Sequence, residues 1–293
     1  MAEDNHDRRA ASDAGTTVTR SKIRGLVALP PLPRRSQELL QLAELVEQTP
    51  ALAARILGVA NSAFFRTQVP VKHITDATIR ILGLNLVRDL SVSFVLNQPF
   101  DLQGCRRFDP IRFWIRSMGS AVLVQLLLRH LPQRNPPTPS TAYLAGLLHN
   151  LGLLVLVHVA PEAMDGVFGE LERHPEASLL AVERQLLGLD HAVAGAELAS
   201  AWKLPSALAA AMGPAGEPSG RDELTTLVSL VLLCRCINRV LDDGDDIGQD
   251  PELDRTLTAL DIRFDGWPAL LSEWRERTEN IEGLAAAFAG PGR

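Results

Sequence analysis

Apolar side chains recur at a helical spacing along most of this chain, and no stretch shows the alternation of β-branched residues that a sheet needs. Several of these segments open on a capping residue followed by proline, as at Thr49-Pro50 and Asp109-Pro110. A side-chain oxygen accepts hydrogen bonds from the free amides of a first helical turn, and proline is tolerated at the first helical position. The pattern therefore predicts an all-α fold.

The helical segments are short and numerous. Before residue 100 we expect helices over about 36–46, 50–60, 75–82 and 84–96; after it we expect them over about 110–130, 141–149, 161–173, 177–187, 191–202, 205–212, 223–241 and 267–282. The most apolar run is Leu144–Ala160, which spans only 17 residues and includes His149, Asn150 and His158. Because a membrane-spanning helix needs about 20 predominantly apolar residues, we interpret this run as the buried centre of a helical domain.

Charge and cysteine content narrow the classes of function. The formal net charge is −6 and aromatic residues make up 5% of the chain, whereas nucleic-acid-binding domains combine basic patches with stacking aromatics. The segment up to Arg35 is basic, with a net charge of +3, and is the one candidate for such binding. The three cysteines, Cys105, Cys234 and Cys236, cannot all pair, so we expect buried, reduced thiols. With no apolar leader segment at the N-terminus, we expect a cytoplasmic protein.

Composition also divides the chain into parts. Residues 1–24 are polar and are predicted to be disordered or frayed. We expect an N-terminal helical part over residues 25–105 and a second helical part over residues 106–241. Residues 242–293 hold 13 acidic and five basic side chains, and are predicted to form an acidic loop and a C-terminal helix that packs on the second part.

Five motifs occur in a characteristic order. In chain order they read LPPLP (29–33), ILGVANSAFF (56–65), FWIRSMGSA (113–121), LAGLLHNLGL (144–153) and GLDHAVAGAELASAWKLP (188–205). Together they resemble the HDOD family, the HD-related output domains of bacterial signalling proteins. The resemblance runs from about Gly25 to Pro218 and implies an N-terminal helical bundle packed on an HD-like helical bundle.

The parent HD superfamily consists of metal-dependent phosphohydrolases, so the matching positions show whether a metal site is expected here. Arg116 stands where the family often has histidine, and the His-Asp doublet becomes His149-Asn150. The later pair of histidines falls on Ala215-Gly216, and the late aspartate falls near Cys234-Arg235. A fixed positive charge at Arg116 would oppose a cation. Only His149 remains as a good ligand, so we expect no catalytic residues, no metal and no cofactor.

The same resemblance points to a vestigial pocket. Its candidate residues are His149, Asn150, Arg116, His191 and Trp114. From the residues alone, His149 and Trp114 are also explained as core side chains, Asn150 as a hydrogen-bonding residue at a helix end, and His191 as a structural residue after a helix cap at Asp190.

Three functions compete. The leading hypothesis is a non-catalytic regulatory pseudo-enzyme of bacterial signal transduction, which binds a sensor, a response regulator, a nucleotide-turnover enzyme or a second copy of itself. The alternative is a metal-dependent phosphohydrolase with a rebuilt site around His149 and His191. The third is nucleic-acid binding through the basic N-terminal segment, which the overall acidity disfavours. No membrane partner is expected.

Overall fold

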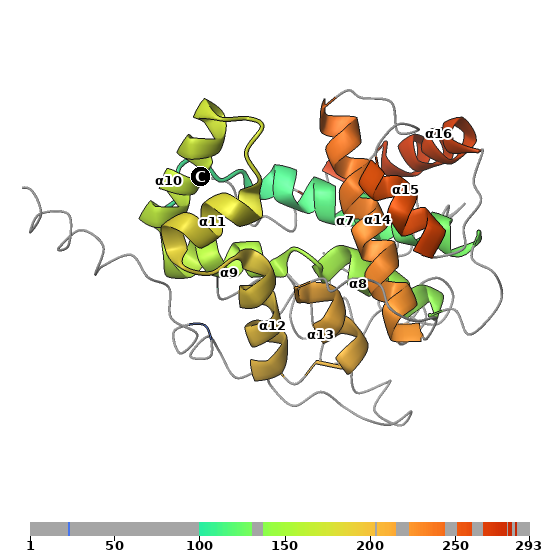
Figure 1. Ribbon diagram of the computed structural model, residues 1–293, viewed down its shortest axis with the longest axis horizontal. Coiled ribbons are helices and arrows are strands. Elements are labelled where there is room, and N and C mark those ends of the chain that lie inside the picture. Colours follow the sequence, from blue (N-terminus) through green and yellow to red (C-terminus); the bar gives the residue numbers. More distant parts are fainter. Residues whose placement is uncertain are drawn as a thin grey trace, which may run out of the picture.

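The computed structural model describes residues 23, 100–130, 137–202, 204–214, 223–243, 251–259, 266–279, 281–282 and 285. The expected helices before residue 100, the LPPLP segment, the 56–65 motif and the acidic residues 244–250 lie outside these ranges. The described part is helical, with no strand in it, which confirms the all-α prediction (Figure 1).

The described helices follow one another through short connections. They are α7 (Pro110–Leu128), α8 (Pro139–Leu148), α9 (Leu151–Val159), α10 (Pro161–Arg173), α11 (Leu179–Leu187), α12 (His191–Ala201), α13 (Ser206–Met212), α14 (Glu223–Asp243), α15 (Pro251–Ala259) and α16 (Trp267–Thr278).

The predicted capping signals determine where two of these helices begin. The Asp109 side chain accepts hydrogen bonds from the amides of Ile111 and Arg112, with Pro110 at the first helical position of α7. The Asp190 side chain accepts from the amide of Val193 at the start of α12. Both residues satisfy amides that would otherwise lack a partner within the helix.

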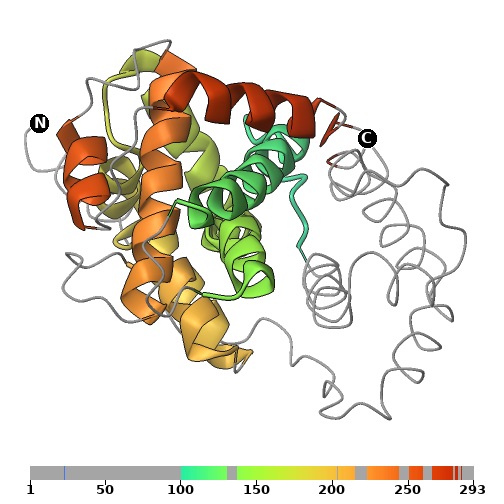
Figure 2. The ribbon, with the colours of Figure 1, turned by 90° about the vertical axis from the view of Figure 1, so that its right-hand side faces the viewer.

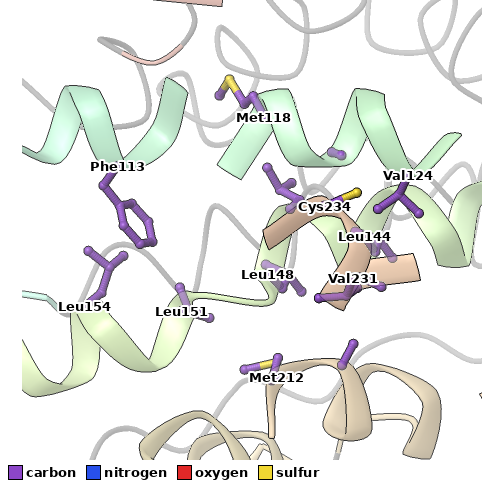
Figure 3. Packing of buried hydrophobic residues seen from close by; sticks show 14 of the residues in the cluster. Phe113, Met118, Val124, Leu144, Leu148, Leu151, Leu154, Met212, Val231 and Cys234 are labelled. Atoms are coloured by element: carbon purple, nitrogen blue, oxygen red, sulfur yellow. The ribbon is translucent and has the colours of Figure 1, made fainter. Parts of the chain in front are cut away.

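The core lies where α7 packs against α8 and α14, continuing through α9 to α12 and α13. In this core Phe113 of α7 faces Leu154 of α9, and Leu148 of α8 lies near Val231 of α14 (Figure 3). The long helix α14 runs beside α7, and α16 also packs on α7 (Figure 2). There the Trp274 indole nitrogen donates to the carbonyl oxygen of Gly119 at 2.9 Å.

Two helical stretches are long and apolar enough to cross a membrane by length and composition. They are Pro110–Leu128 and Thr141–Val159. However, 67% and 78% of their apolar windows are buried inside the structure, as expected for core helices. The second stretch is also not one regular helix, because a turn at His149-Asn150 separates α8 from α9.

The structure differs from the sequence expectations at α9, which was not predicted as a separate helix, and in two regions nearer the ends of the chain. Residues 251–259 form helix α15, in a region that we expected to be loop up to the last helix. Ile23 falls within the segment expected to be frayed, yet its side chain is fully buried in the core cluster. An apolar side chain that packs there is anchored by the apolar surface it removes from water.

Candidate functional site

His149 is the residue that the resemblance equates with a metal ligand. It follows the last residue of α8, and 2% of its surface is exposed. Its Nδ1 donates to the carbonyl oxygen of Gly146 at 2.8 Å. Because a carbonyl oxygen only accepts, Nδ1 carries the proton and Nε2 keeps its lone pair. Burial, reinforced by the nearby Arg235 charge, lowers the pKa of His149 to about 3, so the imidazole is neutral at neutral pH.

Arg235 of α14 lies directly beside His149. Its Nη2 donates to the backbone carbonyl oxygen of His149 at 3.3 Å, although the two residues are 86 positions apart in the chain. The Nε atom of Arg235 is buried. The guanidinium also interacts electrostatically with Asp190 and Glu183, which favour its charged form, while its burial lowers its pKa from the usual value.

Glu183 and His191 form a second buried pair next to this arginine. The Glu183 side chain is fully buried on α11, and its Oε2 accepts hydrogen bonds from the amide of His191 at 2.9 Å and from His191 Nδ1 at 2.7 Å. One carboxylate oxygen therefore fixes both the backbone and the ring at the start of α12. Asp190, buried and adjacent in sequence, caps α12 with Oδ1 and pairs through Oδ2 with Arg184 Nε at 2.5 Å.

Gly152 allows α9 and α12 to approach each other closely. A Cβ atom built on Gly152 would lie 1.9 Å from the carbonyl oxygen of His191 and 2.5 Å from the amide nitrogen of Gly195. The backbones of α9 and α12 are thus in direct contact, and only glycine fits at this position. Since α9 begins just after His149, this contact sets the start of α12 beside the α8–α9 turn. We call the set His149, Glu183, Asp190, His191 and Arg235 the junction cluster.

The structure brings together only some of the predicted pocket residues. His149 and His191 are close enough to interact electrostatically. Asn150 is half-buried, and its side chain makes no capping hydrogen bond to α9. Trp114 is fully buried in the core and packs edge-to-face on Phe113, with ring centroids 5.1 Å apart.

The structure places Arg116 on the outer side of α7. Its side chain is exposed on α7, whereas His149 is buried. Helical geometry explains the difference: Phe113, Trp114 and Ser117 occupy the core-facing side of α7, which leaves Arg116 on the outer side. The arginine next to His149 is Arg235 instead.

Sequence reasoning did not single out Glu183, and it noted Arg235 only as a missing carboxylate. A signal exists for each. Glu183 occupies a core-facing position of α11 together with Val182 and Leu187, and Arg235 interrupts the apolar run Leu232–Ile237. A charged side chain at a core-facing position is costly to bury without a partner, so such a position predicts a buried hydrogen-bonding or charged partner.

Comparison with known proteins identifies the family. The profile of the HDOD domain matches residues 32–218, which is more than half of the chain. The chain belongs to the HDOD family. A comparison with curated proteins found no significant match.

Solved structures share the HDOD fold with this chain. A "putative signal transduction protein" from Marinobacter aquaeolei VT8 is 23% identical with a TM-score of 0.67; the alignment covers 94% of this chain and 66% of that one, just under two thirds of its length. A "putative phosphohydrolase" from Shewanella amazonensis SB2B is 24% identical with a TM-score of 0.67, covering 91% and 97%. An HDOD domain protein of unknown function from Geobacter sulfurreducens is 20% identical with a TM-score of 0.64, covering 92% and 97%.

The junction cluster does not fit the metal ion of the HD superfamily. Among the residues that the structure describes, no group of three or more His, Cys, Asp or Glu side chains could hold a metal ion. The Nε2 lone pair of His149 is available in principle, but Arg235 places a positive charge against the same residue. Glu183 Oε2 is already occupied by two hydrogen bonds from His191. Like charges in a buried site repel strongly, so the described residues of the junction cluster are poorly suited to hold a cation.

Proposed function

We propose that this HDOD protein is a non-catalytic, cytoplasmic regulatory module of bacterial signal transduction that works by binding another signalling protein or a second copy of itself. The observation that carries the proposal is the buried Arg235 guanidinium against His149, at the position where a hydrolase would need a cation. Membership of the HDOD family supports a signalling role.

A phosphohydrolase remains the second candidate, favoured by one observation. His149 carries its proton on Nδ1 and donates it to the Gly146 carbonyl oxygen. Metal-binding histidines are commonly oriented by such a hydrogen bond, which leaves Nε2 available to the metal ion. A structural neighbour is also named as a putative phosphohydrolase. For this function, His149→Ala would abolish both metal binding and turnover of a phosphodiester substrate.

Binding assays in the presence of a chelator test the proposal. The purified protein is examined by sedimentation for self-association, and by cross-linking with candidate receiver domains and sensor proteins, each with and without EDTA. We expect a complex that persists in EDTA and in the His149→Ala variant. A complex that dissociates in EDTA, or phosphodiester hydrolysis that His149→Ala abolishes, would contradict the proposal.

A further inference from the structure

The junction cluster gathers residues from the α8–α9 turn, α11, the start of α12 and α14, and Arg235 is its member on α14. Arg235 extends from α14 to the His149 carbonyl oxygen at the end of α8. Gly152 of α9 lies against the His191 carbonyl oxygen at the start of α12, and the same His191 is held by Glu183 of α11. Arg235 of α14 therefore contacts the α8–α9 turn directly, and it lies near enough to Glu183 and Asp190 for their charges to act on its guanidinium.

The charges of the cluster require a cation. Glu183 and Asp190 are both buried. Asp190 has an exposed partner in Arg184, whose side chain is 62% accessible, so solvent screens much of that attraction. Glu183 Oε1 is buried and makes no hydrogen bond in the described part of the chain, and the same holds for Arg235 Nε. A carboxylate that cannot reach water is costly unless a positive charge lies nearby.

We propose that Arg235 is the internal counter-ion of the junction cluster, taking the electrostatic place that a bound cation holds in a catalytic HD domain and fastening α14 to the α8–α9 turn and the α11–α12 corner. The proposal rests on the non-catalytic function proposed above and goes further, because it assigns a role to a residue that the pocket prediction did not include. It makes the fold of this domain dependent on Arg235 and independent of any metal.

A double-mutant cycle on the full chain tests this role. Thermal unfolding is followed for the wild type, Arg235→Gln, Glu183→Gln and the double variant, all in EDTA. We expect Arg235→Gln to lower Tm by about 5–10 °C, the effect of leaving a buried carboxylate without its partner in a chain of this size. In the double variant neither the Arg235 nor the Glu183 charge remains. The decrease in Tm of this variant should therefore be clearly smaller than the sum of the decreases in the two single variants.

Two further variants keep the test sharp. Arg235→Lys retains the positive charge, so the decrease in its Tm should be less than half of the decrease in Arg235→Gln. Arg129→Gln removes an arginine of an exposed ion pair with Glu273, and should change Tm by less than about 2 °C. If Arg235→Gln does not fold, recovery of folded protein on adding Glu183→Gln supports the role.

Additive losses in the cycle, equal losses in Arg235→Gln and Arg235→Lys, or a double variant that fails to fold would overturn the inference. These results are separate from the test of the proposed function. A wild-type protein that retains a metal ion would overturn the non-catalytic proposal, whereas an additive cycle in a metal-free protein would overturn only the role of Arg235.

Discussion

The imidazole of His149 titrates far below the range of an exposed histidine, and this has a direct consequence for stability. As pH falls below 6.5 the unfolded imidazole takes up a proton, while the folded one stays neutral until about pH 3. The unfolded state binds more protons in this window, so stability that is fully present above pH 6.5 is lost as pH falls.

We predict that His149 alone accounts for a loss of roughly 2 kcal/mol in unfolding free energy between pH 7 and pH 5. His149→Asn, whose amide can donate to the Gly146 carbonyl oxygen, should lack this part of the pH dependence. Denaturant unfolding at the two pH values measures it, with His174→Asn as the control at a histidine whose side chain is 54% exposed. Equal pH dependence in the wild type and His149→Asn would show that His149 is not held neutral.

The residues of the junction cluster differ in how far their roles could be predicted from the sequence. Asp190 was predictable as a helix cap, because a cap interacts with amides of its own next turn. The contact between Arg235 and His149 was not predictable, because the two residues are 86 positions apart in the chain and meet only through tertiary packing. The exposure of Arg116 on α7 was not predictable from the motif correspondence, which fixes a position in the chain but not the side of the helix on which a side chain lies.

The contact between α9 and α12 depends on a single hydrogen atom in place of a methyl group. A Cβ at position 152 would meet backbone atoms of α12, which cannot move aside as a flexible side chain can. We predict that Gly152→Ala lowers the free energy of unfolding by about 3 kcal/mol or more.

Gly166 provides the matched control, because it lies inside α10 and a Cβ built there would meet nothing within 4 Å. Gly166→Ala should raise stability by about 0.5–1 kcal/mol, the helix-propensity gain of alanine over glycine. Denaturant unfolding of both variants gives the comparison. Similar effects of the two substitutions would mean that α9 and α12 are not in backbone contact.

Trp274 joins helix α16 to α7 through a hydrogen bond and through packing. We predict that Trp274→Phe, which removes the 2.9 Å hydrogen bond to Gly119, costs about 1 kcal/mol. Trp274→Ala should cost about 2 kcal/mol or more, because it also removes the packing. Hydrogen exchange of the α16 amides measures the effect: exchange should rise in the order wild type, Phe, Ala, and unchanged protection in the Ala variant would contradict this account of α16.

At the level of elements, the sequence predicts helices well where a local signal marks their ends. The predicted bounds of the helix over 161–173 match α10, which starts at Pro161. A helix end near His149-Asn150 was expected, but α9 was not predicted as a separate helix, because the run Leu144–Ala160 is almost entirely apolar and has no proline. Helix α15 was overlooked in an acidic region, although Asp250-Pro251 repeats the cap-and-proline signal of Asp109-Pro110.

At the scale of the molecule, the chain is an HDOD family member whose described part is helical, and the junction cluster lies among its core helices. Its described helices form one continuous apolar core from α7 to α16. Packing of this core and the pairing of its buried charges therefore both stabilise the described part of the fold. We propose that this domain regulates by binding and does not hydrolyse phosphoesters.

Metal content tests that claim most directly. Elemental analysis is carried out on protein purified without added metal, and again after soaking in Mn²⁺ and Fe²⁺ and desalting. We predict clearly sub-stoichiometric metal in both samples. One or two equivalents of tightly retained metal would contradict the account, because a cation would then be held in spite of Arg235, and hydrolysis of phosphodiesters would become the leading function.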